Sequence, residues 1–199
     1  MTFCNFFFSS TQVAGRMGAF ATALAEKSKT SDLLCELIDR VAKLGFKYCG
    51  DTLNDSNANT DAIKRRIFIR SNKDINTCLI SLAYELTNAL NKEKFTKIFE
   101  AFLHDETPTN ERAQQYASTV LQVESEAMFT KCKIACDLNL QSYIKNPKYL
   151  KIFLAHKDDK ESACQALHQE MVRNGTIGKN KTSAISHYQN QYYQYCKKA

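Results

Sequence analysis

Apolar side chains recur at intervals of three and four residues along most of the chain, which is the spacing that gathers them on one face of a helix. The pattern is clearest where Leu, Ile and Val fill positions 33, 34, 37, 38 and 41 ahead of Gly45. We predict helices over residues 11–28, 31–44, 74–90, 92–103, 107–140, 146–153, 158–173 and 180–197. Six glycines and two prolines leave few turn signals, so helices should dominate.

Two shorter segments predict strands. Residues 65–70 alternate charged and bulky side chains, a period of two that suits a half-buried strand, and residues 46–50 form a second candidate. Residues 51–60, between them, are rich in Asn and Asp and predict a loop. The predicted fold class is α+β, predominantly helical, with a small sheet packed on the helix at 74–90.

No internal repeat or change of composition marks a domain boundary. We therefore predict a single mostly helical domain with a small sheet over residues 1–178, and a C-terminal helix over 179–199 docked on it. Residues 174–178, which contain two glycines, suggest a hinge before that last helix.

The composition is that of a folded globular protein. Of 199 residues, 44% are hydrophobic and 24% are charged, which excludes bulk disorder. No uncharged apolar run approaches the roughly 18 residues that cross a bilayer, so we expect no membrane partner. The net charge of +6 is spread along the chain with small basic clusters at 64–66 and 197–198, so we expect no nucleic acid partner either.

Eight cysteines are too few for a disulfide scaffold in a chain of this length, and several lie among Leu and Ile inside predicted helices. Free thiols of this kind indicate a reducing environment. The N-terminal segment is apolar but lacks a basic flank, so a conventional signal peptide is not predicted. We expect a cytoplasmic protein or one delivered into a cell cytoplasm.

A strand at 65–70, a short polar turn and the helix at 74–90 carry the sequence Tyr84-Glu85-Leu86-Thr87-Asn88. This arrangement resembles the zincin-like metallopeptidases, in which a strand precedes a helix bearing His-Glu-x-x-His. In that family the two histidines bind Zn²⁺ and the glutamate acts on the bound water. Tyr84 and Asn88 stand at the histidine positions and Glu85 at the glutamate. A phenol and an amide are not usual strong Zn²⁺ ligands, so the resemblance implies a scaffold that has lost its zinc.

Helical geometry separates two sides of the helix at 74–90. Positions 75, 78, 79, 82, 86, 89 and 90 are apolar and fall on one broad face, which we predict to be core. Ser81, Tyr84, Glu85 and Asn88 fall on the adjoining polar stripe, where the metal sits in the resembled family. Within this stripe Glu85 is the candidate catalytic residue, and Ser81, Tyr84 and Asn88 are candidate binding residues.

A second carboxylate comes from the helix at 107–140, because the resembled families that use a glutamate as third ligand carry it on a later helix. Glu124 lies on the apolar stripe of this helix, whereas Glu126 points away from it. An inward carboxylate needs a partner, and Lys131 on the same stripe is the candidate. Glu85 and Glu124 are therefore a candidate acid/base pair or atypical metal ligands. The alternative for Glu124 is a salt bridge at the core edge.

Two further groups of residues could carry chemistry. Cys132, Cys136, Cys164 and His168 form two pairs, each one helical turn apart, and could bind zinc if their helices meet, although helical cysteines are commonly just packed. Cys78 lies in the first turn of a helix, which lowers a thiol pKa and suits a nucleophile. Its place on the apolar face favours a packed side chain instead.

The last predicted helix presents Tyr188, Tyr192 and Tyr195 on one face. Tyrosine offers a large contact area at little entropic cost, so this stripe is a candidate partner-binding surface. Docking of the helix on its own domain is the favoured interpretation.

The resemblance implies an interaction or effector-type protein, of bacterial type and acting inside a cell. It would be a pseudoenzyme on a zincin-like scaffold, with a protein partner and no cofactor. One alternative is a diverged hydrolase that uses Glu85 and Glu124. A second is a cysteine-dependent enzyme with Cys78 as nucleophile.

Overall fold

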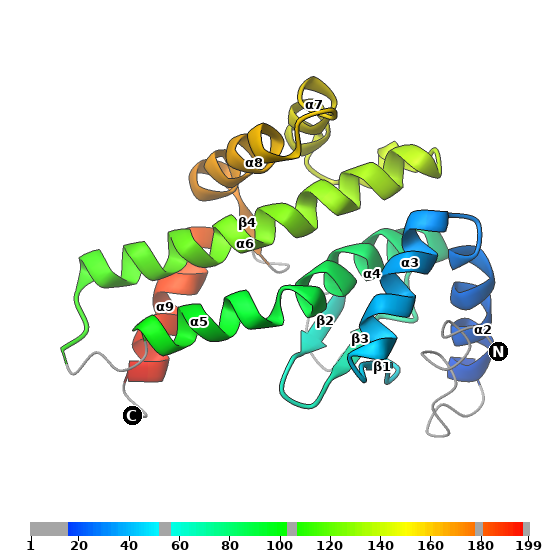
Figure 1. The fold of residues 1–199 in the computed structure, drawn as a ribbon, viewed down its shortest axis with the longest axis horizontal. Coiled ribbons are helices and arrows are strands. Elements are labelled where there is room, and N and C mark those ends of the chain that lie inside the picture. Colours follow the sequence, from blue (N-terminus) through cyan, green and yellow to red (C-terminus); the bar gives the residue numbers. More distant parts are fainter. Residues whose placement is uncertain (1–15, 52–56, 103–106, 178–180, 197–199) are drawn as a thin grey trace. The chain divides into compact units, whose positions relative to one another are not determined.

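The computed structural model describes residues 16–51, 57–102, 107–177 and 181–196, and it is predominantly helical with a small β component, as predicted. The helices are α2 (Arg16–Ser28), α3 (Asp32–Lys43), α4 (Ile75–Leu90), α5 (Lys92–Phe102), α6 (Asn110–Asp137), α7 (Pro147–Ala155), α8 (Lys160–Asn174) and α9 (Ala184–Cys196) (Figure 1). A single 3-10 turn, η1 (Gln141–Tyr143), follows α6. No helix in these ranges is long and apolar enough to cross a bilayer.

The contacts divide the chain into two compact units. Their boundaries differ from those of the predicted segments 1–178 and 179–199. Unit 1 comprises Met1–Leu90 and Thr130–Pro147, and unit 2 comprises Asn91–Phe129 and Lys148–Ala199. The long helix α6 therefore contributes its first 20 residues to unit 2 and its last eight to unit 1. Each unit is described by itself below.

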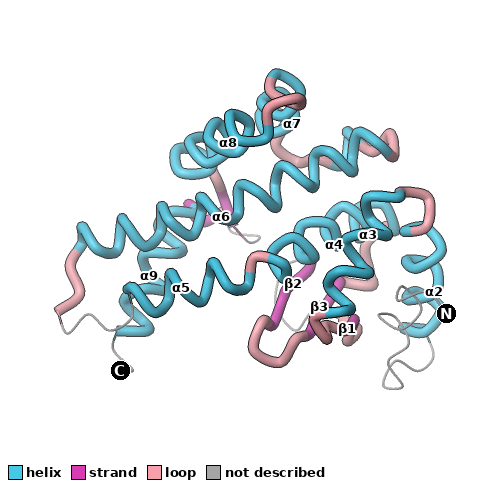
Figure 2. The backbone as a smooth tube through the Cα atoms, viewed as in Figure 1, coloured by secondary structure: helices cyan, strands magenta, loops and turns pink. Residues whose placement is uncertain are grey.

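Unit 1 contains a three-stranded sheet in the order β1-β3-β2, drawn in magenta in Figure 2. Its strands are β1 (Lys47–Tyr48), β2 (Ala58–Asp61) and β3 (Arg66–Ile69); β1 is parallel to β3, and β2 is antiparallel to it. The strands predicted at 46–50 and 65–70 are confirmed. The loop predicted over 51–60 is wrong at its end, because residues 58–61 pair with β3 despite their polar composition; residues 52–56 lie outside the described part.

The helix α4 is the centre of unit 1. The predicted core face is buried at Cys78, Leu79, Leu82, Leu86 and Ala89. Positions 75 and 90 of the predicted face are only partly buried, whereas 80, 81, 83 and 87, which lie outside it, are buried, so the burial of α4 extends beyond the predicted face. The reason is tertiary: α4 contacts α2, α3, η1 and the strands β2 and β3, which leave it little solvent-facing surface.

Local signals explain where the helices of unit 1 begin and end. The Asp74 carboxylate accepts hydrogen bonds from the backbone N–H groups of Asn76 and Thr77, which caps α4. Gly45, with φ of 82°, follows the last turn of α3 and ends that helix at the expected place.

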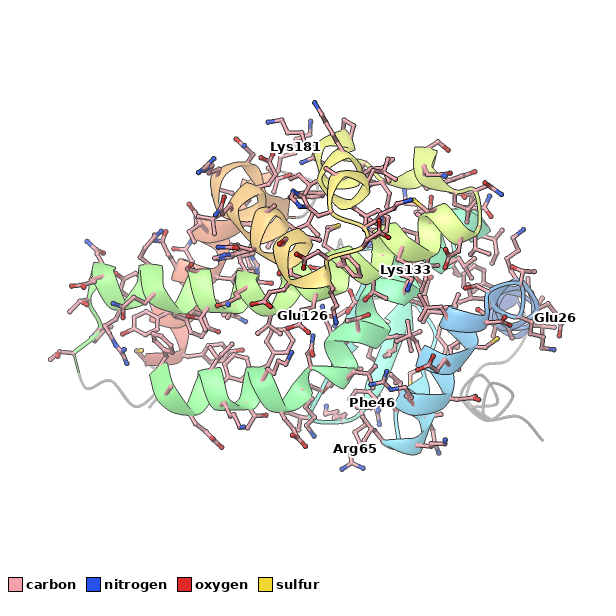
Figure 3. All side chains as sticks on the ribbon, turned by 45° about the horizontal axis from the view of Figure 1, so that its top comes forward. Glu26, Phe46, Arg65, Glu126, Lys133 and Lys181 are labelled. Atoms are coloured by element: carbon pink, nitrogen blue, oxygen red, sulfur yellow. The ribbon has the colours of Figure 1, made fainter. Side chains whose placement is uncertain are left out.

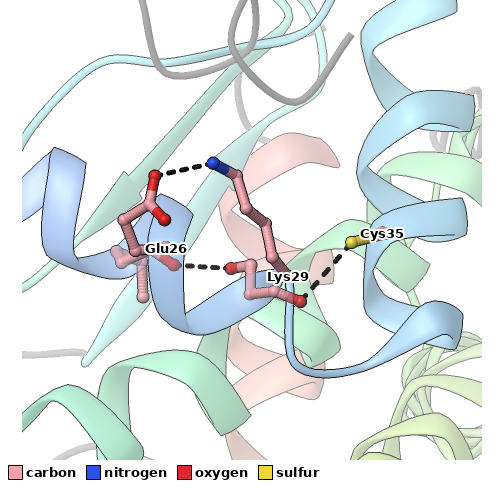
Figure 4. Close-up of polar contacts among 5 residues, drawn as sticks. Glu26, Lys29 and Cys35 are labelled. Atoms are coloured by element: carbon pink, nitrogen blue, oxygen red, sulfur yellow. Dashed lines mark hydrogen bonds and ion pairs between the residues drawn. The ribbon is translucent and has the colours of Figure 1, made fainter. Parts of the chain in front are cut away.

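The turn between α2 and α3 is held by short-range polar contacts (Figure 4). Lys29 Nζ lies 2.6 Å from Glu26 Oε1, and the Cys35 thiol donates to the Ser28 carbonyl at 3.5 Å. The Ser31 hydroxyl accepts from the Leu34 N–H and caps α3. These contacts order the predicted helix pair, of which residues 11–15 lie outside the described part.

Unit 2 is built around an aromatic cluster formed by α5, the first part of α6 and α9. Its buried members are Ile98, Ala113, Tyr116, Val120, Val123 and Tyr192. Five partly buried aromatic residues at 95, 99, 102, 188 and 193 pack against them. Tyr116 is central, because its ring lies 5.7 Å from Phe102 and 5.8 Å from Tyr192 between centroids.

Part of the segment predicted as a hinge forms one strand of a two-stranded sheet in the structure. The strands β4 (Thr176–Ile177) and β5 (Thr182–Ser183) pair in antiparallel fashion, and α9 begins after them at Ala184 instead of at 180. The Ala184 N–H also donates to the Gly175 carbonyl at 2.8 Å. A Cβ at Gly175 would lie 2.3 Å from the Met171 carbonyl oxygen, so this close approach requires glycine.

Candidate functional site

The polar stripe of α4 lies within unit 1, where Ser81, Tyr84, Glu85 and Asn88 are presented by successive turns of one helix. Ser81 is buried, and the other three side chains are partly buried. The stripe therefore faces protein more than solvent. Its surroundings come from β2 and from the last two turns of α6, which belong to the same unit.

Glu85 is bonded to the sheet. The Thr60 hydroxyl on β2 lies 2.7 Å from Glu85 Oε2 and 3.2 Å from the Glu85 carbonyl oxygen. A hydroxyl has one proton to donate, and the shorter distance assigns it to the carboxylate. This hydrogen bond ties the Glu85 carboxylate to β2.

Tyr84 stands where the resembled family has its first histidine, and it contacts a lysine. The Lys131 Nζ lies 5.5 Å from the centre of the Tyr84 ring, within the range of a cation–π contact. Burial lowers the pKa of the Lys131 ammonium, and the neighbouring Cys132 and Glu85 act against that shift. Lys131 was predicted as the partner of Glu124; in unit 1 the carboxylate that acts on it is Glu85.

Asn88 stands where the resembled family has its second histidine. Its Oδ1 atom is buried and has no hydrogen-bond partner among the described residues. A buried amide oxygen without a hydrogen-bond donor lowers the free energy of unfolding, so this position destabilises the fold. The stripe therefore presents the hydrogen-bonded carboxylate of Glu85, the Tyr84 ring beside the Lys131 ammonium, and the Asn88 amide.

Glu124 belongs to unit 2 and is partly buried, on the side of α6 predicted for it. The Tyr188 hydroxyl on α9 donates to Glu124 Oε1 at 2.6 Å. Glu126, predicted to point away, is also partly buried and accepts from Lys94 Nζ at 2.6 Å and 2.8 Å, so the predicted contrast between the two carboxylates is wrong. Each candidate catalytic carboxylate thus has a hydroxyl donor in its own unit, and the joint use of Glu85 and Glu124 stays a prediction.

Cys78 is a packed residue, the interpretation favoured by its place on the apolar face. It is buried, and its thiol lies 3.3 Å from the Arg70 carbonyl oxygen. Burial, followed by the charges of Asp74 and Asp51, raises the pKa of Cys78 to about 12. A nucleophile needs the opposite shift, so this geometry does not favour the cysteine-enzyme alternative.

The candidate zinc ligands are distributed over both units. Cys132 and Cys136 belong to unit 1, whereas Cys164 and His168 belong to unit 2. Burial raises the pKa of Cys132 to about 12, and His168 Nε2 lies 3.1 Å from the Ser118 hydroxyl. Within the described ranges, no three His, Cys, Asp or Glu side chains are grouped as a metal site would need.

The tyrosine stripe of α9 largely faces its own unit. Tyr192 is buried in the aromatic cluster and Tyr188 is bonded to Glu124, whereas Tyr195 is 40% exposed. Two more hydrogen bonds join α9 to α6. The Tyr116 hydroxyl donates to Gln191 Oε1, and the Gln189 amide nitrogen donates to Gln114 Oε1. These contacts are those of a docked helix.

Sequence reasoning missed Thr60 as a hydrogen-bond partner of Glu85. The residue lies in a segment whose Asn and Asp content predicts a loop, and only the β-branched side chain of Thr60 itself hinted at a strand. Comparison of the chain with protein-family models, with curated proteins and with solved structures gave no match.

Proposed function

We propose that this chain is an interaction protein without catalytic activity, in which the helix that resembles a zincin active-site helix has become a structural element. The observation that carries the proposal is the hydrogen bond of 2.7 Å from Thr60 to Glu85. In a metallopeptidase the glutamate must receive a proton from a metal-bound water. Here a strand residue already donates to the carboxylate, which joins β2 to α4.

Tyr84 and Lys131 support the same proposal. A cation held over the Tyr84 ring stabilises the contact between α4 and the end of α6. The stripe thus holds three elements of unit 1 together through polar contacts. This is a structural use of positions that the resembled family uses for zinc.

A diverged hydrolase is a second candidate, and one observation favours it. Lys131 is a lysine of lowered pKa close to a carboxylate, and acid/base catalysis uses groups of this kind. In that case Glu85 would be indispensable to the reaction.

The proposed setting is the inside of a cell, either as a cytoplasmic protein or as one of bacterial effector type delivered there. The seven cysteines in the described part of the chain are all free thiols. Free thiols in this number are typical of reducing compartments. The effector character rests on the resemblance to zincins.

The experiment is a hydrolysis assay on the purified protein with and without added Zn²⁺, using a mixture of quenched fluorescent peptides. We expect no cleavage by the wild-type chain or by Glu85→Gln. The matched control is Glu100→Gln, which changes an exposed carboxylate on α5. Cleavage that is lost in Glu85→Gln and kept in Glu100→Gln would overturn the proposal in favour of the hydrolase.

A further inference from the structure

Two basic segments that are separate in the sequence lie at one end of the unit 1 sheet. The first, residues 43–47, joins α3 to β1, and the second, residues 61–66, joins β2 to β3. Their exposed side chains form what we call the basic end surface. Its members are Lys43, Leu44, Lys47, Ile63, Lys64, Arg65 and Arg66.

The two segments are joined by backbone contacts. Lys47 stands opposite Arg66 in the parallel register of β1 and β3, and the Lys47 N–H donates to the Arg65 carbonyl at 3.1 Å. The Arg65 guanidinium reaches across to Gly45, with Nη1 3.1 Å from the point where a Cβ would stand. Figure 3 shows Phe46 and Arg65 close to one another in unit 1. The surface is thus fixed by the sheet.

The basic end surface concentrates the positive charge of the chain. The two segments hold five Lys and Arg residues and one acid, Asp61, while the whole chain has a net charge of +6. The Asp61 carboxylate already forms a hydrogen bond, because its Oδ1 accepts from the Lys64 N–H at 2.9 Å. In the sequence the excess looks dispersed, and only the pairing of β1 with β3 brings Lys43 and Lys47 to the cluster at 64–66.

Two apolar side chains lie among these cations. Ile63, at the turn between β2 and β3, is 90% exposed, and Leu44, at the end of α3, is 47% exposed. Apolar side chains that share one exposed surface rimmed by polar residues mark interaction sites more often than those scattered singly do. A partner that covers it must therefore offer both negative charge and apolar groups.

We propose that the basic end surface binds an acidic segment of a partner protein, one in which Asp or Glu residues alternate with apolar ones. The carboxylates would pair with Lys64, Arg65 and Arg66, since the arginine guanidinium donates two parallel hydrogen bonds to the oxygens of one carboxylate. The apolar side chains would cover Ile63 and Leu44. This inference rests on the proposed interaction function and names the partner class.

Two other polyanions fit the surface less well. Proteins that bind single-stranded nucleic acid commonly stack its bases on exposed aromatic rings, whereas Phe46 at this end of the sheet is buried. The Asp61 carboxylate beside the cations would also face the uniform negative charge of a bilayer or a nucleic acid.

The test uses the full chain and a short fluorescein-labelled peptide of alternating Glu and Leu, with binding followed by fluorescence anisotropy. The double variant Ile63→Ser/Lys64→Glu removes one apolar and one basic member of the surface. The matched control, Leu154→Ser/Lys133→Glu, makes the same chemical changes at an apolar residue that is 52% exposed and a lysine that is also exposed. We expect the peptide to bind about tenfold more weakly to the first variant than to the control, and more weakly at high salt.

Equal affinity of the two variants would overturn the inference, and so would the absence of peptide binding to the wild-type chain. Preferential binding of phosphatidylserine vesicles or of a labelled oligonucleotide, measured in parallel, would replace the proposed partner class. None of these results affects the hydrolysis assay with Glu85→Gln. The failure of this inference and the failure of the proposed function are therefore distinguishable.

Discussion

The Thr60 hydroxyl lies 2.7 Å from Oε2 of Glu85, and this contact joins the edge strand β2 to the central helix α4. The carboxylate that matches the motif thereby contributes to the packing of the sheet on the helix. Its contribution to stability can be measured directly.

Thr60→Val should destabilise the protein by about 1–3 kcal/mol, because a partly buried carboxylate loses a donor while the shape of the side chain is kept. Urea unfolding would measure the change in the free energy of unfolding. Thr60→Ser retains the hydroxyl and should lie closer to the wild type. A Thr60→Val variant as stable as Thr60→Ser would show that the hydrogen bond contributes nothing.

Lys131 makes the stability dependent on pH. Burial lowers its pKa, so the folded chain binds this proton more weakly than the unfolded chain does. The charged form therefore costs stability at neutral pH, and the cost disappears as the pH rises through the folded-state pKa towards the ordinary value of 10.5. The wild-type protein should gain stability over this window relative to Lys131→Met.

Urea unfolding of the wild type and of Lys131→Met across that window would check this expectation. Lys133→Met, at an exposed position two residues along the same helix, is the matched control. Its difference from the wild type should not change with pH. A constant difference for Lys131→Met as well would mean that the lysine is not desolvated in solution.

Sequence reasoning succeeded where the signals are local. Gly45 ends α3 and Asp74 begins α4 because a positive φ and a capping carboxylate act on the neighbouring backbone alone. These features needed no knowledge of the rest of the chain.

The partners of the candidate residues could not be predicted in the same way. Thr60 meets Glu85 only because β2 pairs with β3 and packs on α4, and Tyr188 meets Glu124 only because α9 docks on α6. Both contacts join residues far apart in the sequence. The same holds for the basic end surface, which exists because β1 pairs with β3.

Cys78 should react slowly with iodoacetamide. With a pKa of about 12, only about one molecule in 10,000 would carry its thiolate at about pH 8. Short exposure followed by mass spectrometry of the alkylated peptides should therefore show label at Cys196, which is only partly buried, before Cys78. Rapid and selective labelling of Cys78 would instead support the cysteine-enzyme alternative.

The tyrosines of α9 distinguish docking from partner binding. Tyr192→Ala removes a buried ring from the aromatic cluster and should cost about 3–5 kcal/mol, as large aromatic-to-alanine changes in cores do. Tyr195→Ala, at a residue that is 40% exposed, is the control and should cost much less. Urea unfolding followed by circular dichroism gives both values. If Tyr192→Ala were as stable as Tyr195→Ala, α9 would not be packed on unit 2 in solution. The tyrosine stripe would then be the better candidate for a partner-binding surface.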